Sequence, residues 1–338
     1  MKNVLFLILI YFNFGMAVEI LADTANDPNI VVFADENLKA AIETELGVTD
    51  PNVSQMQQLT KLYADGLNIV DISGIGYATN LKELYLYNNQ ISELPAEISN
   101  LVNLEKLYLN NNLLGTICPE VGQLVKLEYL WLHYNNLNCL PVNFGDLIEL
   151  REISLHHNII TRIPEEIGNL IHLEVLSLGQ NQLSSLPDGI TNLTELKTLN
   201  ASNNLIRSLP EQIGNLNQLR QINLVANKLT NLPETITNLH SLEQFWLIGN
   251  QLDSKFYCIL VPQLKASNPE LNFFYDPDSN PLAADCTCDL LDLGIISLNW
   301  TRADCQKSNE YCDGADLNHD GFVNLYDLAI MNKLWLEK

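Results

Sequence analysis

The chain has 338 residues and a formal net charge of −23, from 41 acidic against 18 basic residues. So acidic a surface argues against nucleic acid or anionic lipid as the main partner, and it is common in calcium-rich or extracellular proteins. The chain is longer than an ordinary compact domain, but a solenoid grows in one dimension and is not limited to that size.

Residues 1–17 read MKNVLFLILIYFNFGMA, with one lysine, an apolar run and small residues at the end. This order predicts a secretory signal peptide cleaved after Ala17, with cleavage after Ala22 as the alternative. A membrane anchor is the competing interpretation, but the apolar run is interrupted at Asn13 and is short for a span of ~20 residues. We therefore expect a secreted or cell-surface protein without a transmembrane span in the mature chain.

An amphipathic helix is predicted within residues 23–58. Asp35 is placed to cap it and Gly47 to end it. Apolar residues recur between them at helical spacing, at Leu38, Ala41, Ile42 and Leu46. Such a helix would cover the open end of the repeats that follow.

The pattern L-x-x-L-x-L-x-x-N then returns every 23 residues, with starts at Leu81, Leu104, Leu127, Leu150, Leu173, Leu196, Leu219 and Leu242. An asparagine closes each block, at Asn89, Asn112, Asn135, Asn158, Asn181, Asn204, Asn227 and Asn250. Residues 59–80 form an atypical ninth coil, with Leu67 in the place of the asparagine. Self-similarity at this period is the signature of a leucine-rich repeat solenoid, here over residues 59–252.

The repeat predicts an α/β fold. Its alternating leucines point inward from strands that pair in parallel between coils, and the asparagine satisfies backbone groups at the turn. The second half of most blocks reads L-P-x-x-I-x-x-L, where proline permits a turn or a short helix but not a central strand. We expect a right-handed solenoid with a parallel inner sheet and a short helical or irregular convex side. Residues 253–275, with a last strand near Leu271, form the C-terminal cap.

Resemblance supports this interpretation. The LPxxIGNL-type blocks resemble those of secreted bacterial leucine-rich repeat proteins, and residues 31–47 resemble their N-terminal cap. The resemblance implies that the asparagines form a ladder inside the coil.

The concave face carries the candidate partner-binding residues. The outward strand position gives a column of four aromatic residues and then small polar ones, while neighbouring positions add histidines and further tyrosines. Aromatic residues with polar tips are common anchors of recognition surfaces, although tyrosines also stabilise strands. The predicted contact residues are Tyr63, Tyr85, Tyr87, Tyr108, Trp131, His133, Tyr134, His156 and Trp246. His133 and His156 alone are a poor metal site, because no carboxylate or thiolate accompanies them.

The seven cysteines suggest an oxidising compartment. Cys118 and Cys139 lie in neighbouring coils, at positions that differ by two residues within the repeat. The sequence therefore leaves a disulfide between them undecided. If they pair, Cys258 has no partner among the repeats. Four more crowd the C-terminal segment, at Cys286, Cys288, Cys305 and Cys312. Their connectivity does not follow from sequence.

After a linker at residues 276–284, the C-terminal segment contains a predicted calcium loop, DLNHDGFVNLYD. Calcium takes converging oxygens from alternate residues of a tight loop. The predicted ligands are Asp316, Asn318, Asp320, the Phe322 carbonyl, Asn324 and Asp327, with Gly321 at the turn. An exiting helix follows, DLAIMNKLW.

This loop and helix resemble the repeat of type I dockerin domains, which implies a small α-helical calcium-loop domain at residues 285–338. The helix has a counterpart in DLGIISLNW at Asp292, but Pro281 and Ala283 stand at two ligand positions of its loop. We therefore expect one Ca²⁺ site and a degenerate second. The resemblance implies a cohesin-type partner for the segment and a setting of polysaccharide degradation.

Together these features predict a non-catalytic interaction protein, because no motif or spacing singles out a catalytic group. It would bind a protein on the concave face and dock through its C-terminal segment. The alternatives are a carbohydrate-binding accessory, with a glycan on the aromatic residues, and a surface adhesin.

Overall fold

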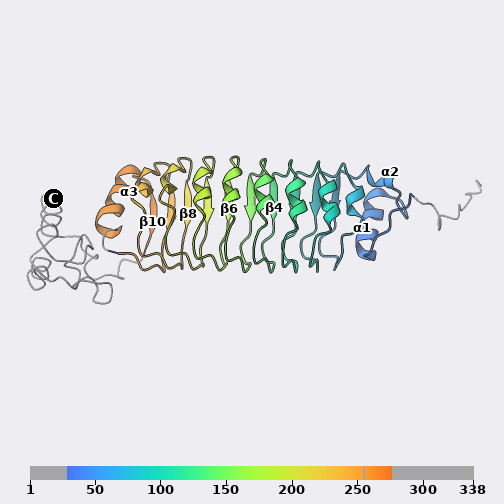
Figure 1. Ribbon diagram of the computed structural model, residues 1–338, viewed down its shortest axis with the longest axis horizontal. Coiled ribbons are helices and arrows are strands. Elements are labelled where there is room, and N and C mark those ends of the chain that lie inside the picture. The colour runs from blue at the N-terminus through green and yellow to red at the C-terminus, as the bar shows by residue number, and fades with distance from the viewer. Residues whose placement is uncertain (1–28, 254–255, 276–338) are drawn as a thin grey trace, which may run out of the picture.

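The computed structural model describes residues 29–253 and 256–275. The coils stack side by side along one long axis, with α1 (Glu36–Leu46) and α2 (Val53–Met56) at one end and α3 (Val261–Ser267) at the other (Figure 1). The predicted signal peptide, linker and calcium-loop segment lie outside the described residues.

A parallel sheet of ten three-residue strands runs along the stack, in chain order from β1 to β10. Each middle residue pairs with the middle residue of the next strand, as Leu62 does with Leu84. The predicted last strand near Leu271 forms as β10. The strands are β1 Lys61–Tyr63, β2 Glu83–Tyr85, β3 Lys106–Tyr108, β4 Tyr129–Trp131, β5 Glu152–Ser154, β6 Val175–Ser177, β7 Thr198–Asn200, β8 Gln221–Asn223, β9 Gln244–Trp246 and β10 Asn272–Phe274.

The core lies between the sheet and the opposite side of each coil. The middle strand residues point into it, and Leu176, for example, has no exposed surface. Isoleucines of the second half-block, such as Ile167, approach from the other side and are equally buried. Because the middle residues face inward, the first and third residues of every strand form the outer surface of the sheet. We call this surface, predicted as concave, the sheet face.

The opposite side consists of short 3₁₀ helices, as the proline positions predict. Pro95, Pro141, Pro164, Pro187 and Pro233 are the residues preceding five of them. The helices are η2 Ile75–Tyr77, η3 Ala96–Asn100, η4 Pro119–Gln123, η5 Val142–Asp146, η6 Glu165–Asn169, η7 Asp188–Asn192, η8 Ile213–Asn215 and η9 Glu234–Asn238. A π-helical turn, η10 Phe256–Leu260, precedes α3.

The 3₁₀ side packs so closely that glycine is needed there. A Cβ atom on Gly145 would stand 2.5 Å from the carbonyl oxygen of Glu166 in the next coil. Backbone therefore approaches backbone between coils, which explains the glycine of the LPxxIGNL block.

The asparagine ladder forms as the family resemblance implies. Asn158 Oδ1 accepts the Leu137 N–H at 2.9 Å, and its Nδ2 donates to the carbonyls of Leu132 and Leu155. Each asparagine thus joins its own coil to the preceding one. At the atypical first coil, the Leu67 N–H donates to Asn89 Oδ1 instead.

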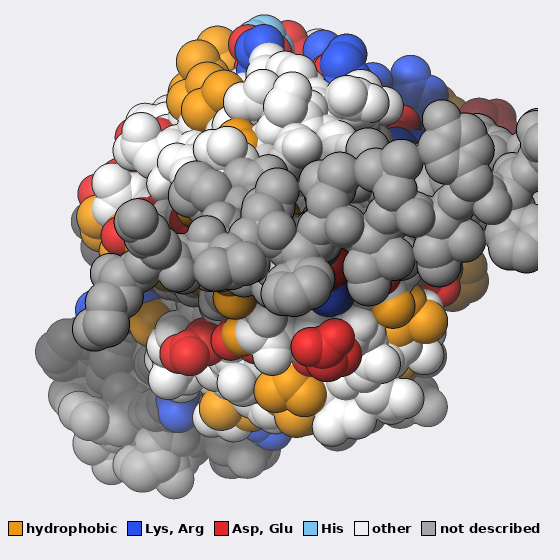
Figure 2. All heavy atoms as spheres, turned by 90° about the vertical axis from the view of Figure 1, so that its right-hand side faces the viewer, with side chains coloured by type: hydrophobic (Ala, Val, Ile, Leu, Met, Phe, Trp, Pro, Cys, Tyr) orange, Lys and Arg blue, Asp and Glu red, His pale blue; other side chains and the backbone are white. Residues whose placement is uncertain are grey.

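Both ends of the described stack are closed by helices. Asp35 caps α1 by accepting the N–H groups of Asn37 and Leu38, and its second oxygen accepts the Val70 N–H of the first coil at 2.7 Å. Gly47 ends the helix with a left-handed backbone, as predicted. Seen from this end, apolar side chains lie in separate patches among acidic and basic ones (Figure 2). At the other end, Asn268 after α3 continues the ladder by accepting the Leu242 N–H.

Cys118 and Cys139 carry free thiols. Cys118 packs against the core and burial raises the pKa of its thiol, whereas Cys139 is exposed. The two side chains thus occupy different environments and do not form the disulfide that their positions left open.

Within the described residues, no helix combines the length and apolar character needed to cross a bilayer.

Candidate functional site: the aromatic strip of the sheet face

The third strand residues align in one row across the sheet face, as predicted. The strand register places Tyr63, Tyr85, Tyr108, Trp131, Ser154, Ser177, Asn200, Asn223, Trp246 and Phe274 side by side in that order. His133 and Tyr134 lie in the turn after β4, and His156 and His157 lie in the turn after β5. Both turns are close to Trp131, the last of the four consecutive aromatic residues in this row. We call Tyr63, Tyr85, Tyr108, Trp131, His133, Tyr134, His156 and His157 the aromatic strip.

The rings of the strip touch one another without a break. Centroids lie 4.7 Å apart for Tyr63 and Tyr85, 4.9 Å for Tyr85 and Tyr108, and 4.5 Å for Tyr108 and Trp131. The contact continues from Trp131 to His133 at 5.8 Å. Aromatic pairs at such separations contribute about 0.5–1.5 kcal/mol each beyond their buried area, so these contacts stabilise the arrangement of the rings.

The strip ends in two stacked pairs. His133 stacks on His156 at 4.4 Å and 15°, and Tyr134 stacks on His157 at 4.0 Å and 29°. Tyr134 and His157 sit in the turn with positive φ angles of 53° and 56°, where asparagine stands in three other coils. This backbone disfavours bulky side chains. Holding two rings there adds exposed aromatic surface at the end of the strip.

Glu83 anchors the first part of the strip. Its carboxylate pairs with Lys61 at 2.8 Å and Lys106 at 3.3 Å and accepts the Tyr85 hydroxyl at 2.7 Å. Hydrogen bonding to Lys61 and Tyr85 lowers the pKa of Glu83 to about 2, and burial together with Glu83 raises the pKa of Tyr85 to about 12. Lys61 also lies 4.6 Å from the Tyr63 ring centroid. The Glu83 carboxylate thus holds the Tyr85 ring and both lysines in place.

Glu152 supports the middle of the strip. It accepts the Trp131 indole N–H at 2.8 Å, which orients the indole ring. Burial, with the charge of Glu152 as a further cause, raises the pKa of the Tyr108 hydroxyl. Sequence reasoning did not single out Glu83 or Glu152. Glu83 lies two residues before Tyr85 on the same face of β2, and Glu152, which pairs with Tyr129 in the register, reaches diagonally to Trp131.

Burial favours the neutral form of two histidines, His133 and His156. Burial, aided by His156 and His157, lowers the pKa of His133 to about 4, and burial also lowers the pKa of His156. His133 Nδ1 bonds Ser154 Oγ at 3.0 Å, while His156 Nδ1 and His157 Nδ1 are 2.7 Å apart. Because the folded pKa of His133 is lowered, its contribution to stability is complete above pH 6.5 and is lost as the pH falls through about 4.

Two predicted contact residues lie apart from the strip. Trp246 is at the far end of the row, stacked on Phe274 at 5.9 Å and 8°. Small polar residues separate it from Trp131. Tyr87 occupies the same position in its coil as His133 does two coils later. A hydrogen bond to Asp65 raises the pKa of the Tyr87 hydroxyl. Of the nine predicted residues, seven therefore belong to the continuous strip, Tyr87 lies beside it, and Trp246 forms a separate aromatic pair with Phe274.

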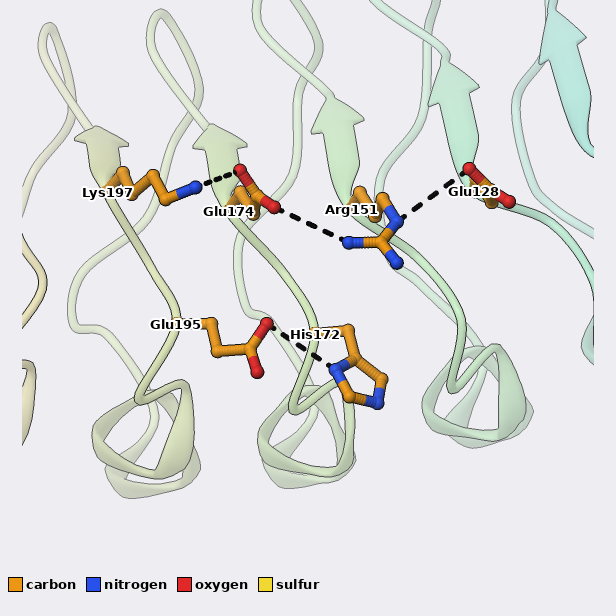
Figure 3. A network of polar contacts seen from close by, with 6 residues as sticks. All are labelled: Glu128, Arg151, His172, Glu174, Glu195 and Lys197. Atoms are coloured by element: carbon orange, nitrogen blue, oxygen red, sulfur yellow. Dashed lines mark hydrogen bonds and ion pairs between the residues drawn. The ribbon is translucent and has the colours of Figure 1, made fainter.

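Charge is balanced along the edge of the sheet face where the chain enters the strands. Glu128, Arg151, Glu174 and Lys197, each 23 residues from the next, form a continuous series of ion pairs (Figure 3). Lys82 with Glu105 and Arg220 with Glu243 extend the same row. Acidic residues occur instead in the first turns of the 3₁₀ helices, as at Glu97, Glu120, Glu165, Glu166, Asp188 and Glu234. The net negative charge of the chain is therefore not concentrated along this edge of the sheet face.

Across residues 29–253 and 256–275, no group of three or more histidine, cysteine, aspartate or glutamate side chains is arranged to hold a metal ion. The strip presents ring edges, hydroxyls and imidazoles. This chemistry suits contact with another molecule.

Family comparisons agree with the repeat architecture. Family models described as "Leucine-rich repeat region", "Leucine Rich repeats (2 copies)" and "Leucine rich repeat" match residues 160–263, 79–121 and 102–160. No curated protein sequence matches the chain.

Several solved structures share the fold. Internalin C2 of Listeria monocytogenes is 24% identical with a TM-score of 0.55, over 72% of this chain and 95% of that one. The functional domain of InlJ from the same organism is 22% identical with a TM-score of 0.55, over 72% and 59%.

A third similar structure is the ectodomain of the Arabidopsis thaliana receptor kinase GASSHO1/SCHENGEN3 in complex with CASPARIAN STRIP INTEGRITY FACTOR 2. It is 29% identical with a TM-score of 0.51, over 56% of this chain. The match spans only 24% of that ectodomain.

Proposed function

The chain is a leucine-rich repeat protein, and from this premise we propose that it binds a protein partner, without catalysis, through the aromatic strip of the sheet face. The observation that carries the proposal is the unbroken series of ring contacts from Tyr63 to His157 on the sheet face. Such a surface offers large, preordered contact area, which reduces the entropy lost on binding.

The arrangement of the rings favours a protein over a glycan. A sugar ring stacks on the open face of an aromatic ring. In the strip, neighbouring ring centroids lie 4.5–4.9 Å apart, with one pair stacked at 23° and two tilted at 49° and 48°, so each ring partly shields the face of its neighbour. Ring edges and hydroxyls remain, and these suit the side chains and backbone of a protein. The complex of the plant receptor ectodomain also supports recognition by such repeats.

Removing the centre of the strip should abolish binding. Tyr108→Ala with Trp131→Ala deletes two rings in mutual contact but leaves the inward leucines intact. In affinity capture from culture supernatant, quantified by mass spectrometry, we expect the proteins captured by the wild type to be lost.

The matched control is Gln221→Ala with Gln244→Ala, two changes on the same face outside the strip. This control should retain the captured proteins, and both double variants should melt near the wild-type temperature. Equal capture by the strip variant and the wild type would place the binding site elsewhere. Glycan-array binding that the strip variant loses would favour the carbohydrate alternative.

We also propose, from sequence alone, that the protein is exported and that its C-terminal segment binds calcium and docks to a cohesin-type partner. The support is the spacing of Asp316, Asn318, Asp320, Asn324 and Asp327, whose oxygens would converge on a hard cation. Binding would contribute to folding, because the ligands converge only in a folded loop.

Calorimetric titration of the full chain with Ca²⁺ should give a stoichiometry near one. Asp316→Ala with Asp320→Ala should remove the binding, whereas Asp304→Ala, in the same segment but outside both loops, should retain it. A stoichiometry near two would show that the first loop also binds. The absence of any heat of binding would contradict the calcium proposal while leaving the proposal for the strip untouched.

A further inference from the structure

Four exposed aliphatic side chains form a row away from the sheet face. Val102, Val125, Ile148 and Ile171 are each one repeat of 23 residues from the next and are 47%, 47%, 49% and 51% exposed. They stand on the segments that lead from the 3₁₀ helices back to the strands. Thr79 and Thr194 occupy the same position in the flanking coils, so the aliphatic row covers four adjacent coils and then ends.

A polar row runs directly beside it, formed by the following residue of each coil: Asn103, Lys126, Glu149 and His172. Lys126 Nζ donates to Asn103 Oδ1 at 2.8 Å and has no carboxylate partner among the described ion pairs. Glu149 likewise takes part in none of them. His172 lies on the connecting segment and faces Glu195 at 3.4 Å (Figure 3).

The two rows are complementary to themselves under a two-fold rotation. If two stacks lie antiparallel, with the axis midway between the coils of Val125 and Ile148, each row meets its own copy in reverse order. Val125 then faces Ile148 of a second copy, and Val102 faces Ile171. In the polar row, Lys126 faces Glu149, so the two unpaired charges meet opposite charges twice. Isologous contacts of this kind are the commonest interface in homodimers.

We propose that two copies of this chain associate antiparallel through these rows. The observations behind it are the four-coil aliphatic row and the oppositely charged Lys126 and Glu149, which take part in none of the described ion pairs and are placed symmetrically about its centre. The sheet face lies on another side of the coil and stays open, so the dimer would present two aromatic strips.

The size of the contact sets the expected affinity. An exposed apolar patch on a monomer typically covers roughly 300–600 Å². Two such patches facing each other bury roughly 600–1,200 Å², at or below the lower limit of the roughly 1,200–2,000 Å² that stable complexes bury. The dimer should therefore be weak, with a dissociation constant on the order of micromolar.

Sedimentation velocity of the full chain across protein concentration tests the apolar part. The wild type should shift from monomer to dimer, and Ile148→Asp should remain monomeric, because it places a charge at the centre of the contact. Ile159→Asp is the matched control, since Ile159 is 45% exposed but lies in a different row. A wild type that is monomeric at every concentration, or a dimer that survives Ile148→Asp, would overturn the proposal.

A charge exchange tests the register. Lys126→Glu and Glu149→Lys should each weaken the dimer roughly tenfold, since each replaces two attractive pairs with two repulsive ones. The double variant restores opposite charges and should return the dissociation constant to within about twofold of the wild type. A double variant no tighter than either single one would contradict the antiparallel register.

Discussion

Replacing Leu176 with aspartate is expected to abolish the cooperative unfolding transition of the repeat domain. Leu176 is the middle residue of β6, has no exposed surface, and lies in register between Ile153 and Leu199. A carboxylate there must be buried unpaired or protonated, and either costs several kcal/mol. Because folded domains have only about 5–15 kcal/mol of stability, this loss is a large share of the total.

Circular dichroism during heating measures the effect, and the neighbouring residue provides the control. Val175 points to the sheet face, so Val175→Asp should melt close to the wild type. If Leu176→Asp also melts like the wild type, the inward positions have been assigned to the wrong face of the strand.

The second large effect is expected from the asparagine ladder. Asn158→Leu keeps the size of the side chain but removes its three buried hydrogen bonds, to the Leu137 N–H and the carbonyls of Leu132 and Leu155. An unsatisfied buried backbone group costs about 1–3 kcal/mol. We expect the free energy of unfolding, from urea denaturation, to fall by about 3 kcal/mol or more.

Hydrogen exchange should show where this stability is lost. In a solenoid each coil contacts only its neighbours, so protection should fall first in the coils of β4 and β5. Asn138→Leu is the control, because Asn138 is exposed and its change should cost within about 0.5 kcal/mol. Equal stability of the two variants would mean that the ladder does not join the coils.

The architecture was predictable because one physical constraint repeats. The 23-residue period sets which residues pair, so the column from Tyr63 to Trp246 follows from counting alone. The cap residues Asp35 and Gly47 were equally readable, since each has a specific backbone role.

Other features of the strip depend on side-chain geometry that counting does not supply. The sequence does not show that His156 and His157 bring their Nδ1 atoms within 2.7 Å, or that Glu152 binds the Trp131 indole. The contact set predicted from the sequence also includes Trp246, whereas in the structure small polar residues separate Trp246 from the strip. Single exposed aliphatic residues are ordinary in a sequence, so the row from Val102 to Ile171 becomes a patch only through the alignment of the coils.

Site-specific photo-crosslinking tests the central claim, that a protein partner binds the aromatic strip, most directly. Tyr108, in the centre of the strip, is replaced by p-benzoylphenylalanine, and in a second protein the same change is made at Val142, 60% exposed on the 3₁₀ side. After irradiation in culture supernatant, the account predicts a discrete protein adduct from position 108 and none from position 142. An adduct from position 142 with none from position 108 would contradict it.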